Sequence, residues 1–147
     1  MKAYLTKSYG PDARFEASEV PTPELTQGQV LIEVKGTSIN AIDNKFLRYD
    51  IGLNPELPSV LHGDVAGIVA AVASDVSEFK VGDEVYACAG GFLGNAGALA
   101  EYMPADAKFV AHKPKTLSFA EAAALPLVAI TSWEALVDSA KIQPGDH

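Results

Sequence analysis

The sequence lacks several features that mark secreted, nucleic-acid-binding and membrane proteins. It has one cysteine, Cys88, so no disulfide can form within the chain. Lysine and arginine total 11 against 19 acidic residues, which gives a net charge of −8. That charge disfavours nucleic acids and acidic membrane surfaces as partners. Its apolar runs are too short to span a bilayer, and the N-terminus has no signal-peptide stretch. We therefore expect a cytoplasmic protein that binds neither nucleic acids nor membranes.

Common catalytic signatures are absent as well. The sequence has no G-x-S-x-G elbow, no G-x-x-x-x-G-K-[ST] loop and no G-x-G-x-x-G turn. A glycine-rich stretch at residues 90–94 does not open a helix after a strand, so we interpret it as a flexible surface loop.

Metal-binding patterns are equally weak. The candidate ligands are Cys88, His62, His112 and His147, without C-x-x-C or H-x-x-x-H spacing. Cys88 is expected to be a small buried residue, and His112 a surface residue at the end of a strand. His62 and Asp64 are two apart, which on a strand would place both on one face. A third ligand is not evident, so no metal site is predicted.

Short strands separated by glycine and proline turns are predicted for most of the chain. The expected strands cover residues 1–7, 15–20, 29–35, 64–73, 84–88, 98–103 and 108–112. A short helix or turn is expected at 40–49. Ser118 and Glu121 have the spacing of a helix capping box, and Pro126 is suited to begin a second helix over 127–140. The layout is mainly β with C-terminal helices, typical of a barrel or sandwich.

The last residues of the sequence predict the start of a further α/β unit. A helix at 127–140 followed by a turn at 144–147 is the front edge of an α/β unit whose strand does not follow. We expect the sequence to be an incomplete piece of an enzyme. A polar cluster at 40–45 follows a strong strand, and by itself indicates a capped helix with a solvated face.

An ordered set of segments carries a family resemblance. The chain resembles the N-terminal half of a medium-chain dehydrogenase/reductase, in the zinc-independent quinone oxidoreductase branch that includes zeta-crystallin. The segments are GTSINAID at 36–43, LPSVLHGDVAGIV at 57–69, FKVGDEVY at 79–86, GALAEY at 97–102, AAALPL at 122–127 and TSW at 131–133. Each is weak alone, but they occur in family order across nearly the whole chain.

The resemblance implies both a fold and an activity. Residues 1–117 would form a GroES-like, partly open β-barrel, and 118–147 a helical segment leading into a truncated Rossmann domain. The parent would reduce quinones or α,β-unsaturated carbonyls by direct hydride transfer from NADPH or NADH, without zinc. It would be a homodimer through the missing domain, and the isolated fragment would be inactive.

The resemblance also implies site residues. Asn40 matches an asparagine that lines the cofactor cleft, Thr131 a threonine near the nicotinamide, and Lys45 a lysine of enone-reducing members. Lys45 would bind cofactor and stabilise negative charge on the substrate oxygen. Asp43 is expected to pin its loop by accepting backbone N–H bonds. Arg48 would either pair with a cofactor phosphate or be a solvated helix residue.

Two other classes of function stay open. Zinc-dependent relatives have a cysteine in place of Asn40 and a His-Glu pair in place of Gly63 and Asp64, so the resemblance agrees with a metal-free site. A zinc-type alcohol dehydrogenase relative is the first alternative, and bound metal would distinguish it. The second is a non-enzymatic binding module of GroES-like shape.

Overall fold

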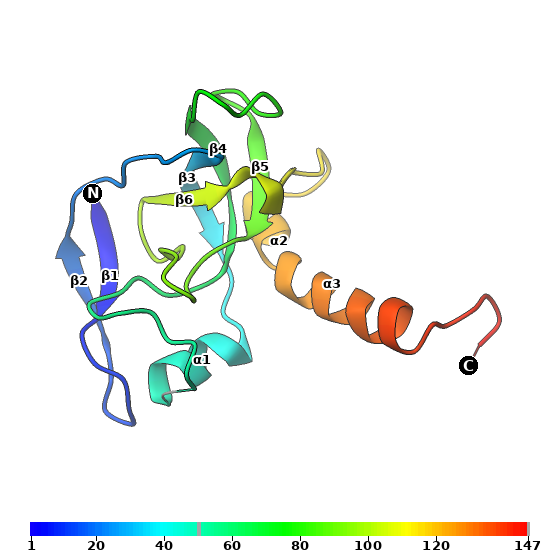
Figure 1. The fold of residues 1–147 in the computed structure, drawn as a ribbon, viewed down its shortest axis with the longest axis horizontal. Coiled ribbons are helices and arrows are strands. Elements are labelled where there is room, and N and C mark those ends of the chain that lie inside the picture. The colour runs from blue at the N-terminus through cyan, green and yellow to red at the C-terminus, as the bar shows by residue number, and fades with distance from the viewer. Residues whose placement is uncertain (50, 147) are drawn as a thin grey trace.

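An open, five-stranded antiparallel sheet forms the centre of the molecule. The computed structural model describes residues 1–49 and 51–146, so His147 lies outside the described residues. The strand order is β6-β3-β4-β5-β7, and a separate two-stranded ribbon of β1 and β2 lies at one side (Figure 1). The strands are β1 Lys2–Thr6, β2 Phe15–Glu19, β3 Gln29–Thr37, β4 Asp64–Val72, β5 Glu84–Cys88, β6 Tyr102–Asp106 and β7 Val110–His112. The mainly β, partly open architecture is confirmed.

Branched aliphatic side chains on the central strands build the main core. β3 and β4 are rich in valine and isoleucine, which favour a pleated and buried surface. The fully buried members include Val30, Ile32, Val65, Val69, Val85 and Met103. The core therefore consists of side chains from the central strands and from the segments that pack against them.

Gly67 marks the closest approach of β3 and β4. A Cβ atom at this position would lie 2.1 Å from the Glu33 carbonyl oxygen and 2.7 Å from Cγ2 of Ile32. The pairing of the two strands is irregular between Val34 and Gly36, which pair with Gly67 and Ala66. Glycine is needed at position 67 because the neighbouring backbone occupies the space of a side chain.

Two capped helices attach to this sheet. Helix α1, Ala41–Arg48, begins after Asn40, and α2, Phe119–Ala123, begins after Ser118. The predicted capping box of α2 is confirmed: the Ser118 hydroxyl accepts from the Glu121 amide at 3.3 Å, and the Glu121 carboxylate accepts from the Ser118 amide at 2.8 Å. Two buried alanines of α2 pack against Ala66 of β4.

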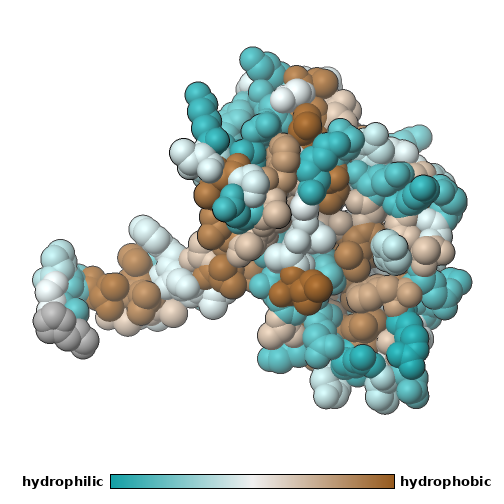
Figure 2. Space-filling model, turned by 180° about the vertical axis from the view of Figure 1, so that it is seen from behind, coloured by the Kyte–Doolittle hydropathy of each residue, from teal (hydrophilic) through white to brown (hydrophobic). Residues whose placement is uncertain are grey.

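Helix α3, Pro126–Trp133, continues into the π-helical η2, Glu134–Ser139, and together they extend away from the sheet (Figure 1). The predicted helix at 127–140 is confirmed, with a change of winding after Trp133. Figure 2 shows apolar side chains along this arm. The exposed ones are Val128, Ile130, Trp133, Leu136 and Val137. Across the two described stretches, we find no helix with the length and apolar character needed to cross a membrane.

Two strand predictions were wrong in their bounds. The strand expected at 98–103 begins at Tyr102 and continues through Pro104 to Asp106. Pro104 is tolerated because β6 is an edge strand that pairs with β3 on one side. The strand expected at 108–112 is shortened, since the 3-10 turn η1, Ala107–Phe109, occupies its start.

The glycine-rich loop is more closely packed than expected. Gly90, Gly91 and Gly97 are buried, and only its middle, residues 93–95, is exposed. A Cβ atom at Gly97 would lie 2.1 Å from the Leu61 carbonyl oxygen. The glycines at both ends of the loop allow close backbone contact with the segment that contains His62, so the description as a flexible surface loop was wrong for these ends.

Candidate functional site

A buried carboxylate joins three separate elements beside the polar cluster. Asp64, the first residue of β4, is 1% exposed. Its Oδ2 accepts from Ser38 Oγ at 2.6 Å and from Asn40 Nδ2 at 2.9 Å, and its Oδ1 accepts from the Leu127 amide at 3.0 Å. Asn40 Nδ2 also donates to Ser38 Oγ at 2.8 Å. The carboxylate therefore fixes the Asn40 amide and ties the start of α3 to the sheet.

The single cysteine faces this carboxylate. Cys88 pairs with Asp64 across β4 and β5. Burial raises the pKa of the Cys88 thiol to about 12, and the negative charge of Asp64 adds to the effect. Cys88 is half-buried and protonated at neutral pH, so it offers neither a nucleophile nor a thiolate ligand.

Asp43 pins the start of α1, as expected. Its Oδ2 accepts from the Asn40 amide at 2.6 Å, and the side chain is 5% exposed. Burial raises the pKa of Asp43, while the bond from Asn40 and the nearby His62 act in the opposite direction. The same carboxyl group thus caps the helix and reaches toward His62.

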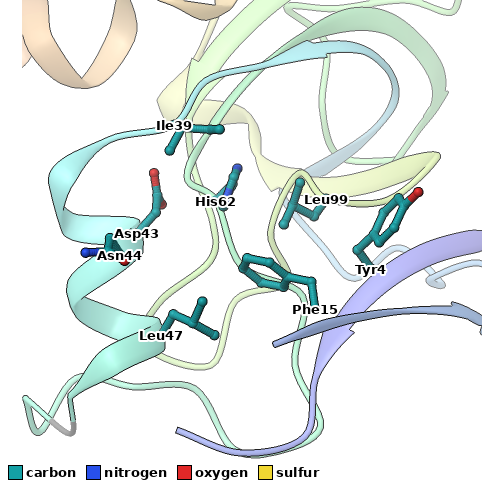
Figure 3. Close-up of a pocket in the computed structure, with 8 residues that line it drawn as sticks. All are labelled: Tyr4, Phe15, Ile39, Asp43, Asn44, Leu47, His62 and Leu99. Atoms are coloured by element: carbon teal, nitrogen blue, oxygen red, sulfur yellow. The ribbon is translucent and has the colours of Figure 1, made fainter. Parts of the chain in front are cut away.

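A cavity of about 440 Å³ lies between α1, the β1–β2 ribbon and the segment before β4 (Figure 3). Most of its lining is apolar or aromatic, with three polar side chains on one side. The lining residues are Tyr4, Phe15, Ile39, Asp43, Asn44, Leu47, His62 and Leu99. A mostly apolar cavity with a few convergent polar groups is the usual form of a small-molecule site.

His62 is the residue of this cavity that sequence reasoning did not place. It precedes β4 and has a φ of 75°, so the argument that it shares a strand face with Asp64 was wrong. Its ring meets Phe15 edge-on at 5.8 Å between centroids. Burial lowers the pKa of His62, although the nearby Asp43 opposes this shift. The sequence signal was only the adjacent pair His62-Gly63, which does not reveal the backbone conformation.

The other predicted site residues lie outside the cavity lining. Asn40 belongs to the Asp64 network, whereas Lys45 on α1 and Thr131 on α3 are exposed. The Asp64–Leu127 bond brings the start of α3 next to Asn40, but Lys45 has no such link to either. Their roles toward a ligand stay predictions. Arg48 donates to the Pro11 carbonyl, so it ties α1 to the loop before β2.

The donor set does not fit a zinc site. Among residues 1–49 and 51–146, no three His, Cys, Asp or Glu side chains are grouped so as to hold a metal ion. Asn40 and Gly63 provide no thiolate or imidazole, and Asp64 is committed to three hydrogen-bond donors. His112 lies at the exposed end of β7, as expected.

Several proteins of known sequence are similar to the chain over nearly all of its length. A 2-methylene-furan-3-one reductase of Solanum lycopersicum is 42% identical over 92% of the chain. An NADPH-dependent alkenal/one oxidoreductase, chloroplastic, of Arabidopsis thaliana is 39% identical over 93%. The chain spans 37% of the length of each of these relatives.

Solved structures agree with this similarity. An alcohol dehydrogenase superfamily protein from Novosphingobium aromaticivorans superposes with a TM-score of 0.91 at 34% identity. The match covers 99% of the chain and 44% of the Novosphingobium protein. The quinone oxidoreductase from Coxiella burnetii has a TM-score of 0.85 at 32% identity. The match covers 99% of the chain and 47% of the Coxiella protein. The family model for the alcohol dehydrogenase GroES-like domain matches residues 26–115. The chain therefore belongs to the alcohol dehydrogenase GroES-like domain family, within the medium-chain dehydrogenase/reductase superfamily.

Proposed function

We propose that the chain is the substrate-side domain of an NAD(P)H-dependent oxidoreductase that reduces quinones or α,β-unsaturated carbonyls without zinc. The observation that carries this proposal is the similarity, over 93% of the chain, to a relative named as an NADPH-dependent alkenal/one oxidoreductase. The lack of a zinc donor set around Asn40 and Asp64 supports the metal-free form. A mostly apolar cavity suits an uncharged carbonyl substrate.

The proposed domain division is residues 1–117 for the GroES-like domain and 118–147 for a segment leading into a Rossmann domain. Its support is the arm of α3 and η2, which extends away from the sheet in Figure 1 and whose large apolar residues are exposed. An exposed apolar surface of this kind needs a partner to cover it. A homodimer formed through that second domain and a cytoplasmic location remain proposals; some relatives are named as chloroplastic or mitochondrial.

The chain's own residues suit one wall of a nicotinamide site. Asn40 is held in one orientation by Ser38 and Asp64, so it would present a fixed amide to a cofactor. Thr131 would offer a hydroxyl from the exposed side of α3. A bound nicotinamide supplies the hydride for the reduction. Lys45 would then stabilise negative charge that develops on the substrate oxygen.

Changing Lys45 to alanine tests this role in a complete polypeptide that includes the proposed Rossmann domain. With NADPH and 2-cyclohexenone as substrates, we expect kcat to fall about a hundredfold, because one charged donor to the developing oxyanion is lost. Lys115→Ala, a change of another exposed lysine, serves as the control and should leave kcat unchanged. Turnover by Lys45→Ala at the wild-type rate would remove the lysine from the reaction. Absence of NADPH oxidation by the wild type with enones and quinones would contradict the proposed function.

The fluorescence of Trp133 tests the domain proposal. It is the single tryptophan of the chain, and it is 63% exposed on α3. In the 147-residue chain we expect red-shifted emission that acrylamide quenches efficiently. In the complete polypeptide, the same residue should be covered, so a Trp133-only variant should emit at shorter wavelength and resist quenching. Equal quenching in both forms would show that no following domain covers α3.

A further inference from the structure

Asp64 is a buried carboxylate whose charge is not balanced by a cation. Only 1% of the residue is exposed, and none of the ion pairs among residues 1–49 and 51–146 involves it. His62 is close enough to be affected by the charge of Asp64, but burial lowers the pKa of His62 and keeps its ring neutral. Aspartate is rarely this buried without a positive partner, because removing a charge from water is costly.

Neutral donors offset only part of this charge. Both carboxylate oxygens of Asp64 accept hydrogen bonds, from the Ser38 hydroxyl, the Asn40 side chain and the Leu127 amide. Leu127 lies in the first turn of α3, and the N-terminus of a helix carries about half a positive charge. No donor carries a full positive charge, so a negative potential remains around the carboxylate. This potential acts on Cys88, where burial and then the charge of Asp64 raise the pKa of the thiol to about 12.

The same carboxylate is connected to both proposed cofactor contacts. Asn40 donates to it directly, at 2.9 Å from Nδ2 to Oδ2. Thr131 follows Leu127 by four residues, so its exposed side chain lies one helical turn beyond the amide that Asp64 holds. A ligand group that binds Asn40 and Thr131 would therefore lie within the electrostatic field of Asp64. Since that field is negative, it favours a positively charged group at this place.

We propose that Asp64 is a positioning residue whose charge also favours the oxidised, positively charged nicotinamide ring over the reduced, neutral one. Each enone that is reduced takes a hydride from NADPH and a proton from water, and leaves the ring with a positive charge. A carboxylate behind Asn40 lowers the energy of that charge as it develops. This inference rests on the proposed reductase function and deepens it, because hydride transfer from NADPH does not by itself require a buried anion.

The affinities for the two cofactor forms test the inference, in a complete polypeptide that includes the proposed Rossmann domain. NADP⁺ and NADPH differ only in the redox state and charge of the ring, so a general disturbance of the structure should weaken both equally. In Asp64→Asn we expect the ratio of Kd for NADP⁺ to Kd for NADPH to rise by about tenfold, the effect of removing one charge from a partly buried site. Isothermal titration calorimetry measures both constants.

Three further variants separate the charge of Asp64 from its hydrogen bonds. Ser38→Ala keeps the charge but removes a donor to Asp64 and an acceptor for Asn40, so it should weaken both cofactors and leave the ratio unchanged. Asp64→Ser is a second neutral variant that still offers an acceptor, and it should raise the ratio as Asp64→Asn does. Asp75→Asn, at an exposed aspartate beyond the other end of β4, should change neither constant. Circular dichroism checks that each variant is folded.

The outcomes distinguish this inference from the function on which it rests. An unchanged ratio in the neutral variants of Asp64, or an equal rise of the ratio in Ser38→Ala, would overturn the inference. A wild-type protein that binds NADP⁺ more than about tenfold more weakly than NADPH would also contradict it. If the ratio rises as expected but neither enones nor quinones oxidise NADPH, only the proposed function fails. A wild-type protein that binds neither cofactor would contradict both.

Discussion

The Gly67→Ala variant is expected to lose about 4 kcal/mol of the free energy of unfolding, a large part of the stability of a domain of ordinary size. The added methyl group would meet the Glu33 carbonyl oxygen at 2.1 Å. Relief requires β3 and β4 to separate, and these strands hold the centre of the sheet. Chemical denaturation of the 147-residue chain, followed by circular dichroism, measures the loss.

Gly94→Ala provides the matched control. Gly94 has a φ of 81° with nothing within 4 Å of an added Cβ atom, so alanine there is strained but not obstructed. We expect a loss of about 1 kcal/mol, the usual penalty of the left-handed region. If the two variants were equally stable, the close approach of β3 and β4 at Gly67 would not be a determinant of the fold.

Asp64→Ala is expected to lower the free energy of unfolding by about 3 kcal/mol, since three partly buried donors lose their shared acceptor. The donors are the Ser38 hydroxyl, the Asn40 amide group and the Leu127 backbone amide. Asp64→Asn should have an intermediate effect, because it keeps the size but turns one acceptor into a donor. Asp12→Ala, at an exposed aspartate, should change stability by less than about 0.5 kcal/mol.

Hydrogen exchange gives this variant a second, local readout. The Leu127 amide is bonded to Asp64 rather than to a helical carbonyl. In Asp64→Ala it should exchange much faster than in the wild type, while amides in β4 and β5 keep their relative protection. Unchanged protection at Leu127 would show that α3 is held to the sheet by other contacts.

Features set by neighbours in sequence could be predicted, and features set by distant segments could not. The capping box of Ser118 and Glu121 needs residues three apart, and the strand Glu84–Cys88 follows from its own composition and the turn before it. The bounds of β6 were missed because Pro104 excludes a central strand but not an edge strand.

The candidate site shows the same limit. The polar cluster at 40–45 predicted a capped helix, and the structure places Asn40 and Asp43 at the start of α1. The role of Asn40 in a cofactor site was implied by the family resemblance and not by the cluster. The cavity draws its walls from segments as far apart as Tyr4 and Leu99, so no short motif encodes it. The conformation of His62 depends on the packing of Gly91, which lies 29 positions away by number, and its φ cannot be read from the residue type.

The pairing of Cys88 with Asp64 affects how readily electrophiles alkylate the Cys88 thiol. Conjugated carbonyls and quinones, the proposed substrates, are electrophiles that alkylate thiolates. With a thiol pKa of about 12, roughly one Cys88 side chain in 10⁵ is ionised at neutral pH, compared with about one in 100 for a thiol at the ordinary value of 9.0. Cys88 should therefore resist alkylation by the proposed substrates, and the carboxylate that anchors α3 provides part of that resistance.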